Sequence, residues 1–204
     1  MLHERFFYLK QEGTIMAATE PIRRKHQVRE LAAYYLKRGE IRNHVLIVMG
    51  VHTALRISDL LRLRWEDVYD FENNCILNSI TVVEKKTKKS KIIALNSQIK
   101  TALTVYIATA RPGAFIFENK LTGNSISRIQ AYRIIRAASE ALKFTRYISC
   151  HSLRKTFGYH AWKNGVSPVV IMDIYNHSSL AVTQRYLGVT QDDRNAVYLN
   201  LDFS

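Results

Sequence analysis

Apolar positions in the first part of the chain recur at helical spacing. They do so from Lys25 to Lys37, after Pro21, which suits a helix start, and before Gly39, which tolerates the left-handed backbone of a helix end. A second helix is expected at about 41–51. A third is expected where Ile57, Leu60, Leu61 and Leu63 are apolar and where Ser58 and Asp59 stand near the first turn. The chain therefore opens with a series of short helices.

The hydrophobic period then changes from that of a helix to that of a strand. Segments 75–83 and 91–95 are rich in Ile, Val and Thr, and the polar run Glu84–Ser90 lies between them. Two such segments around a polar turn predict an antiparallel hairpin with several lysines at its tip.

Helical spacing returns after the hairpin and continues to the C-terminus. We expect a helix at 97–110, ended by Arg111-Pro112-Gly113, and a short strand or extended segment at 114–117. Further helices are expected at about 125–142, 152–164, 167–174, 180–186 and 192–199, with Gly165 and Pro168 marking a helix end and a helix start. The predicted fold class is mainly α with a small antiparallel β-sheet (α+β). Its parts are a leader at 1–20, one domain at 21–190 and a C-terminal segment at 191–204.

The composition is that of an ordinary folded protein except for its charge. The chain has 204 residues, of which 47% are hydrophobic and 23% charged, and this suits one folded domain with short extensions. Thirty Lys and Arg stand against 17 Asp and Glu, which gives a formal net charge of +13. A field of this sign predicts a polyanionic partner, either nucleic acid or an acidic membrane surface.

Several classes of protein are excluded by patterns that the sequence lacks. The two cysteines, Cys75 and Cys150, make no disulfide framework and fit a reducing compartment. The longest apolar run, Val45–Val51, is too short to span a membrane, and the N-terminus does not resemble a secretory signal. The glycines form no nucleotide-binding loop, and the histidines pair with no cysteines at zinc-finger spacing. We therefore expect no membrane partner, no metal and no nucleotide cofactor.

Five features could carry chemistry, although each of them alone is more often structural. They are Arg56, the lysine run at the hairpin tip, the pair His151 and Arg154, His177, and Tyr186. Arg56 could simply pair with Asp59, three residues later, and a lysine run at a turn is usually solvated. A lone histidine is most often structural, and a tyrosine in an amphipathic helix most often packs against its neighbours. Their order along the chain is more informative than any one of them.

Taken in that order, the five features resemble the catalytic domain of the phage integrase family, the tyrosine recombinases, over roughly residues 25–190. The family's first motif, T-G-L-R-x-S-E-L, is matched by residues 53–60, and its K-T-G-K hairpin by residues 86–89. Its second motif, H-x-L-R-H-T-F, is matched by residues 151–157, and its third, L-G-H-S-S-x-x-T-T-x-x-Y, by residues 175–186. Ala54 and Asn176 stand where glycine is usual, and Asp59 replaces glutamate. Asn176 tolerates a positive φ better than most residues do.

The resemblance implies metal-independent DNA strand transfer, with the tyrosine-recombinase catalytic-domain fold. Tyr186 would attack a phosphodiester and form a 3′-phosphotyrosine, which splits one difficult step into two easier ones. Arg56 and Arg154 would clamp the non-bridging oxygens, on which negative charge accumulates. Asp59 is expected to orient the arginine site rather than to act in catalysis itself.

The same resemblance assigns the proton transfers. Lys86, on the hairpin, would protonate the leaving deoxyribose hydroxyl as a general acid. His151 would serve as an acid–base partner, and His177 would donate a hydrogen bond to the phosphate. The bond energy stays in the phosphotyrosine, so a second DNA end can reverse the step, and this explains why no nucleotide site is needed.

The basic residues predict how DNA is bound. We expect phosphate contacts from residues of the hairpin and of the segment 128–155, namely Lys85, Lys88, Lys89, Arg128, Arg133 and Lys155. The expected partner is double-stranded DNA, bound by a homotetramer on paired sites, with a monomer in the absence of DNA as an alternative. The segment 191–204 packs either on a neighbouring protomer or on its own domain. The resemblance places such a protein in the cytoplasm, encoded by a bacterium or a phage.

Two hypotheses of function stay open. The first is a site-specific recombinase of integrase or invertase type, and the second is a non-catalytic DNA-binding regulator on a recombinase scaffold. The intact set of six residues favours the first, and a type IB topoisomerase is a lesser enzymatic alternative. Family members commonly carry a separate N-terminal DNA-clamping domain, and we expect the residues ahead of Arg56 to be too few to hold one. We therefore expect either a fragment or a short single-domain member, similar in size to the fimbrial switch invertases.

Overall fold

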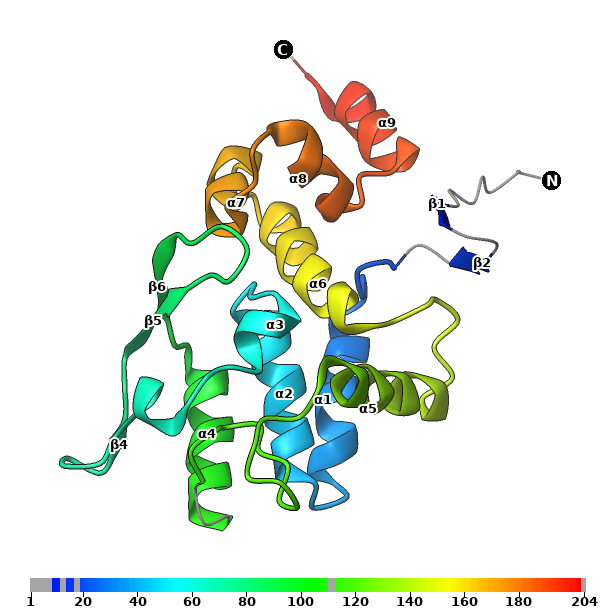
Figure 1. Ribbon diagram of the computed structural model, residues 1–204. Coiled ribbons are helices and arrows are strands. Elements are labelled where there is room, and N and C mark those ends of the chain that lie inside the picture. The colour runs from blue at the N-terminus through cyan, green and yellow to red at the C-terminus, as the bar shows by residue number, and fades with distance from the viewer. Residues whose placement is uncertain (1–8, 12–13, 17–18, 110–112, 203–204) are drawn as a thin grey trace.

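The computed structural model describes residues 9–11, 14–16, 19–109 and 113–202, and the fold is given for these parts of the chain (Figure 1). The helices are α1 (Lys25–Leu36), α2 (Ile41–His52), α3 (Ile57–Leu60), α4 (Ser97–Thr109), α5 (Arg128–Ala141), α6 (Cys150–Lys163), α7 (Pro168–Tyr175), α8 (Leu180–Leu187) and α9 (Gln191–Asn200), with a 3-10 turn at Trp65–Asp67. The strands are β1 (Leu9–Gln11), β2 (Thr14–Met16), β3 (Tyr69–Asp70), β4 (Cys75–Ile76), β5 (Ser79–Val83) and β6 (Ser90–Ala94), and they form three antiparallel pairs.

The predicted fold class, mainly helical with small antiparallel sheets, is confirmed. The helix boundaries follow the predicted ones closely where turn chemistry marks them. Gly39 and Gly165 have φ angles of +71° and +86° just beyond their helices, and Pro168 occupies the first turn of α7. The helix expected at 97–110 ends at Thr109, and the predicted terminator Arg111-Pro112 lies outside the described residues.

The helix start expected at Pro21 is wrong, because the residues that follow it bind to α6. The backbone nitrogen of Ile22 donates to Thr156 Oγ1 at 2.9 Å, and the Ile22 carbonyl lies 2.9 Å from His160 Nε2. These bonds hold residues 21–24 in an extended path, so α1 begins at Lys25. In the leader, β1 and β2 pair with Leu9 opposite Met16, a hairpin that the weak pattern of residues 1–20 did not predict.

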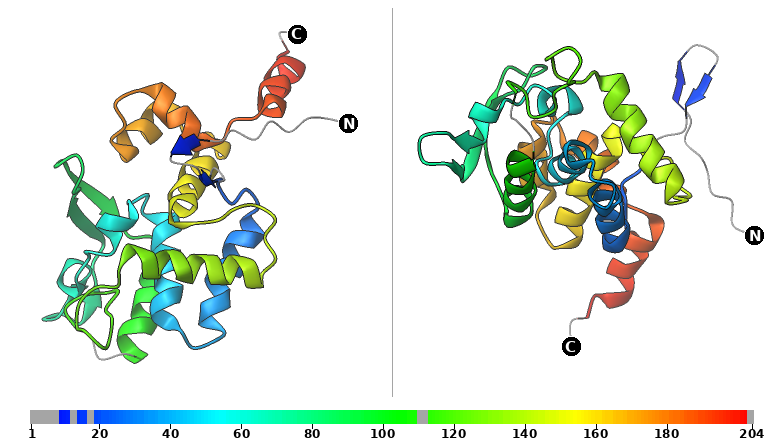
Figure 2. Two further views of the ribbon diagram at one scale, coloured as in Figure 1. Left: turned by 45° about the vertical axis from the view of Figure 1, so that its right-hand side comes forward. Right: turned by 90° about the horizontal axis from the view of Figure 1, so that it is seen from below.

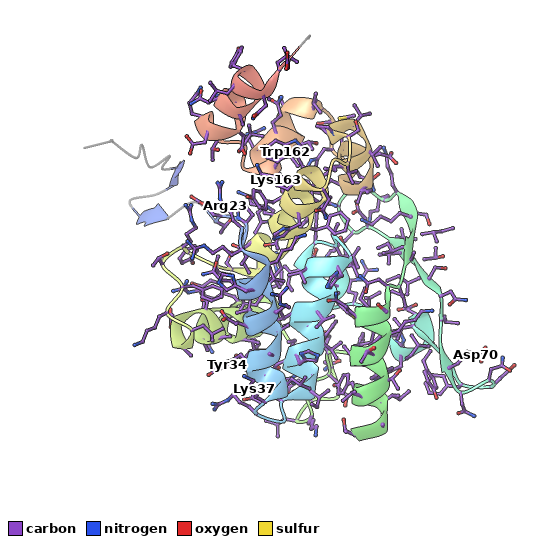
Figure 3. All side chains as sticks on the ribbon, turned by 180° about the vertical axis from the view of Figure 1, so that it is seen from behind. Arg23, Tyr34, Lys37, Asp70, Trp162 and Lys163 are labelled. Atoms are coloured by element: carbon purple, nitrogen blue, oxygen red, sulfur yellow. The ribbon has the colours of Figure 1, made fainter. Side chains whose placement is uncertain are left out.

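The strand expected at 75–83 is also wrong as a single strand, because the chain changes partners in its middle. The nitrogen of Leu77 donates to Val68 O at 2.9 Å, while Asn78 O accepts from the nitrogen of Leu95 at 2.8 Å. β4 therefore pairs with β3, and β5 pairs with β6 with Ser79 opposite Ala94. Asp70, the last residue of β3, lies well away from the helical body (Figure 3).

α2 is the central helix of the fold. It is buried without interruption from Val45 to Val51, and it packs against α1, α4 and α6 (Figure 1). Each fully buried aliphatic side chain of this kind contributes roughly 1.5–3 kcal/mol, so α2 adds substantially to the stability of the core beside the site. None of the described helices is long and apolar enough to cross a membrane.

α6, α7 and α8 lie above this core, beside the β5–β6 hairpin (Figures 1 and 2). Gly158 lets α7 approach α6, because a Cβ at this position would lie 2.3 Å from the hydroxyl of Tyr175. That hydroxyl donates to Arg154 O at 2.6 Å and so ties α7 to α6. α9 projects from the body and has no buried residue (Figure 2).

Candidate active site

Arg56 enters the site from the start of α3, after a strained turn. Ala54, which precedes it, has a φ of +55° and is completely buried. A left-handed alanine costs about 1–2 kcal/mol, which explains why glycine would suit the position. The turn directs the Ala54 carbonyl toward α6 and leaves Arg56 as the residue that caps α3.

Arg154 lies on α6 and is 1% exposed. Its guanidinium donates to the Ala54 carbonyl and, at 2.8 Å, to the Tyr175 carbonyl, and it stacks 4.5 Å from the centre of the Tyr175 ring. Burial, together with the positive charge of Arg56, lowers the pKa of Arg154 from its ordinary value. Through these two hydrogen bonds the buried, charged Arg154 connects α6 to the end of α7 and to the turn before α3.

A buried carboxylate that the sequence analysis missed, Glu84, lies between the two arginines. Its Oε2 accepts from Arg56 at 2.7 Å, and its Oε1 lies 4.0 Å from an Arg154 nitrogen. Burial by itself would raise the pKa of Glu84, but hydrogen bonds from Thr87, Arg56 and Asn176 outweigh it and lower that pKa to about 2. The group is therefore a carboxylate throughout the neutral range.

Asp59, expected to orient the arginine site, has a different contact. Its Oδ1 accepts from the backbone nitrogen of Lys85 at 2.9 Å, and the side chain is 2% exposed. The carboxylate that pairs with Arg56 is Glu84, so Asp59 does not meet that arginine directly and bears on the arginine site through the hairpin. The shorter side chain of aspartate reaches the hairpin backbone from the first turn of α3, and Asp59 fixes the hairpin instead.

The hairpin presents two kinds of lysine. Lys86 lies at the exposed tip, together with Lys85, Lys88 and Lys89. Lys91, on β6, is directed inward: its side chain is 14% exposed, and its Nζ lies 3.2 Å from Glu84 Oε1 and 3.3 Å from Ile174 O. Burial lowers the pKa of Lys91 from its ordinary value. Alternation along β6 could have indicated Lys91, because it shares the inner face with Ile93.

His177, His151 and Tyr186 form a cluster of rings. The left-handed Asn176, with a φ of +51°, ends α7 and turns the chain into His177, whose Nδ1 lies 3.1 Å from Thr183 Oγ1. The ring centres of His177 and His151 lie 4.5 Å and 4.9 Å from that of Tyr186. The structure thus brings together three residues that the sequence separates by up to 35 positions.

Both histidines are held in the neutral form at neutral pH. Burial and the nearby arginines lower the pKa of His177 to about 4. For His151, burial together with the charges of Lys155 and Arg154 has the same effect and lowers the pKa to about 4. A neutral imidazole can accept a proton, and a bound phosphate would favour the protonated form by opposing the positive charges around it.

The remaining basic residues predicted to bind DNA lie at separate places. Arg128 and Arg133 are exposed on α5, while the tip lysines are exposed on the hairpin. Lys155 donates to Thr19 O at 2.7 Å and lies 5.8 Å from the centre of the Tyr186 ring, so it contacts both the leader and the ring cluster. Among the described residues, no three His, Cys, Asp or Glu side chains gather in a way that could hold a metal ion.

The arrangement can bind and activate a phosphodiester. Two arginines and an inward lysine supply positive charge, and the buried carboxylate of Glu84 opposes them. A phenol lies beside two neutral imidazoles at the edge of this charge.

Comparison with known proteins agrees with this geometry. The sequence profile of the phage integrase family matches residues 22–192. The chain is 35% identical over 183 residues to the probable integrase/recombinase YoeC of Bacillus subtilis. The matched region covers 90% of this chain and 97% of YoeC. It is 26% identical over 165 residues to the tyrosine recombinase XerD of Corynebacterium glutamicum, covering 78% of this chain and 52% of XerD.

Solved structures share the fold. The crystal structure of XerA recombinase superposes with a TM-score of 0.72 at 19% identity, over 91% of this chain and 68% of that one. The XerH site-specific recombinase, in a post-cleavage complex with palindromic difH substrate, superposes with a TM-score of 0.71 at 18% identity. The superposition covers 94% of this chain and 56% of the XerH chain. This chain thus spans about half the length of XerD and nearly all of YoeC.

Proposed function

This chain belongs to the phage integrase family, and on that premise we propose that it is a site-specific recombinase that cleaves and rejoins DNA through a 3′-phosphotyrosine. One observation carries the proposal. The ring centres of Tyr186 and His177 lie 4.5 Å apart. Asn176, which precedes His177, donates to the Glu84 carboxylate, and that carboxylate binds Arg56. These contacts link residues 130 positions apart, and this supports a phosphate site that Arg56 and Tyr186 share.

The proposed reaction conserves the phosphodiester energy. The Tyr186 oxygen attacks the phosphorus, the bond to the 5′ oxygen breaks, and that oxygen leaves with a proton donated by Lys86. Arg56 and Arg154 stabilise the charge that accumulates on the non-bridging oxygens. The reverse reaction, with a 5′ hydroxyl from a second DNA end, regenerates the free tyrosine and completes strand exchange.

The histidines have separate proposed roles. His151, neutral in the free protein, accepts the proton that Tyr186 loses, since the two rings are in contact. His177, fixed by Thr183, donates a hydrogen bond to the phosphate. The contact of His177 with Thr183 defines which ring nitrogen is left free for the phosphate.

The proposed partner is duplex DNA, bound by the hairpin tip and by the exposed arginines of α5. Residues 21–190 would form the catalytic unit, and 191–204 would join protomers into a tetramer on paired sites. The support is that α9 has no buried residue and carries exposed apolar side chains near its C-terminal end: Val197, Tyr198 and Leu199 are 64%, 82% and 83% exposed. We place the protein in the cytoplasm of a bacterial cell, where such DNA lies.

The test is covalent trapping on nicked DNA that carries the protein's own recombination site, taken from the repeats beside its gene. The nick lets the cleaved strand diffuse away, so the phosphotyrosine accumulates. The proposal predicts a DNA adduct that resists detergent and that forms equally well with EDTA present. DNA binding without any adduct on this site would instead support the regulator on a recombinase scaffold.

A further inference from the structure

We propose that Glu84 is a positioning residue that fixes Arg56, Lys86 and His177 relative to one another; this inference rests on the proposed function. Glu84 lies at the junction of β5 and the hairpin turn, and its side chain is completely buried. A buried carboxylate without a metal or a substrate is costly unless its partners are arranged around it. The partners of Glu84 show what it arranges.

A single oxygen of Glu84 accepts three hydrogen bonds from three separate segments. Oε2 lies 2.7 Å from Arg56 Nη1, 2.8 Å from Thr87 Oγ1 and 3.1 Å from Asn176 Nδ2. Arg56 is a proposed phosphate ligand. Thr87 directly follows Lys86, and Asn176 directly precedes His177. The oxygen is therefore a common reference point for the start of α3, the hairpin tip and the end of α7.

The other oxygen balances the remaining positive charge. Oε1 lies 3.2 Å from Lys91 Nζ and 4.0 Å from Arg154 Nη1. Arg56, Lys91 and Arg154 would repel one another at this separation if nothing negative lay between them. Glu84 offsets one of the three charges and leaves a net positive site for the phosphate.

The hairpin tip is attached to the core by Glu84 and Asp59 together. Glu84 O accepts from the nitrogen of Lys88 at 2.9 Å, and the nitrogen of Glu84 donates to Lys89 O at 3.0 Å. Asp59 accepts from the nitrogen of Lys85 at 2.9 Å. Lys86 thus lies between two residues that are bonded to the core, Lys85 to Asp59 and Thr87 to Glu84, so the backbone from which its side chain extends is held on both sides.

Glutamine cannot replace this carboxylate, although it has the same size. If its oxygen accepted the three bonds of Oε2, its NH2 group would point at Lys91 and Arg154, both of which are donors. If the amide were reversed, Arg56 would face a donor. Either orientation displaces at least one cation, and a displacement of about 1 Å can cost a factor of about 10² in rate.

The experiment compares Glu84→Gln with Glu30→Gln, a matched change at an exposed glutamate on α1. The measured quantities are the adduct formation rate at saturating DNA and the affinity for that DNA. We expect Glu84→Gln to form adduct about 10²-fold more slowly with affinity changed less than about threefold, and Glu30→Gln to match wild type. A rate for Glu84→Gln within about threefold of wild type overturns the inference while the proposed function stands.

A second variant, Glu84→Ala, provides a test by chemical rescue. Formate can enter the space that the carboxylate leaves, so formate should raise both the adduct formation rate and the melting temperature of this variant above their values in chloride at equal ionic strength. Wild type should respond equally to both salts. If wild type forms no adduct, the proposed function fails, and the melting temperatures still show whether Glu84 is the counter-ion of the buried cations. A melting temperature of Glu84→Ala that is equal in formate and in chloride overturns this role of Glu84.

Discussion

Replacing Arg154 with lysine should weaken both the fold and the chemistry, and the structure gives the size of the first effect. The two terminal nitrogens of Arg154 donate to the carbonyls of Ala54 and Tyr175, two residues that are completely buried. The single ammonium nitrogen of lysine carries three donors but cannot take the places of both guanidinium nitrogens, so it satisfies one of these carbonyls with good geometry. The other is left without a donor, at a cost of about 1–3 kcal/mol.

The change in stability is measurable by thermal unfolding. A chain of this size loses about 2–4 °C of melting temperature per kcal/mol, so Arg154→Lys should melt about 2–12 °C below wild type. Arg29→Lys, an exposed change on α1, serves as the control and should melt with wild type. At temperatures where both variants are folded, Arg154→Lys should form adduct at least about 10²-fold more slowly, because a point charge cannot reproduce bidentate contact. A variant that melts with the control and cleaves at the wild-type rate would refute both roles of Arg154.

Three further predictions follow from the strain, the charge and the histidines. Ala54→Gly should change the unfolding free energy by less than about 1 kcal/mol, because relief of the left-handed strain is offset by the lost methyl group and by the freer unfolded chain. Ala54→Val should destabilise the protein by about 2–4 kcal/mol, and urea titrations measure both changes. Equal effects of the two variants would show that the φ of +55° carries no strain. Affinity for duplex DNA should fall by ~10³–10⁵ between 50 and 200 mM salt if about six to ten phosphates are contacted, and a flat response in a filter-binding or anisotropy titration would contradict the phosphate contacts. The pKa values of His151 and His177 are about 4 in the folded chain against 6.5 ordinarily, so the unfolded chain binds more protons between these pH values, and stability should fall as pH drops from 6.5 toward 4. A double variant, His151→Gln with His177→Asn, should show a shallower fall in stability. A pH dependence equal to that of wild type would contradict the neutral histidines.

Periodicity and turn chemistry predicted most of the helices, because these signals are local. Gly39, Gly165 and Pro168 mark helix ends through their own backbone preferences. Asn176 was expected to tolerate a positive φ, and it does adopt one at the end of α7. Pro21 misled, because the path of its neighbours is determined by Thr156 and His160, more than 130 residues away.

The candidate site was predictable in its outline but not in its electrostatics. The order of Arg56, His151, Arg154, His177 and Tyr186 is visible in the sequence, and the structure brings these residues together. Glu84 was missed because it begins a run of lysines that suggests a solvated turn, and nothing local indicates that its carboxylate is buried against arginines from α3 and α6. Spacing along the chain suggested Asp59 as a possible partner of Arg56, whereas the carboxylate that meets Arg56 comes from the hairpin.

The central claim is that Tyr186 is the nucleophile, and mapping the covalent adduct tests it most directly. Tyr186→Phe removes one oxygen and keeps the ring that contacts His151 and His177, so folding and DNA binding should survive. Two nearby tyrosines are available as internal alternatives: Tyr175, whose buried hydroxyl is already bonded to Arg154 O, and Tyr198, which is 82% exposed on α9.

On nicked DNA carrying its own site, wild type should give an adduct whose digestion places the nucleotide on the peptide that contains Tyr186, and Tyr186→Phe should give none. An adduct on the Tyr175 or Tyr198 peptide, or an adduct that persists in Tyr186→Phe, would contradict the account.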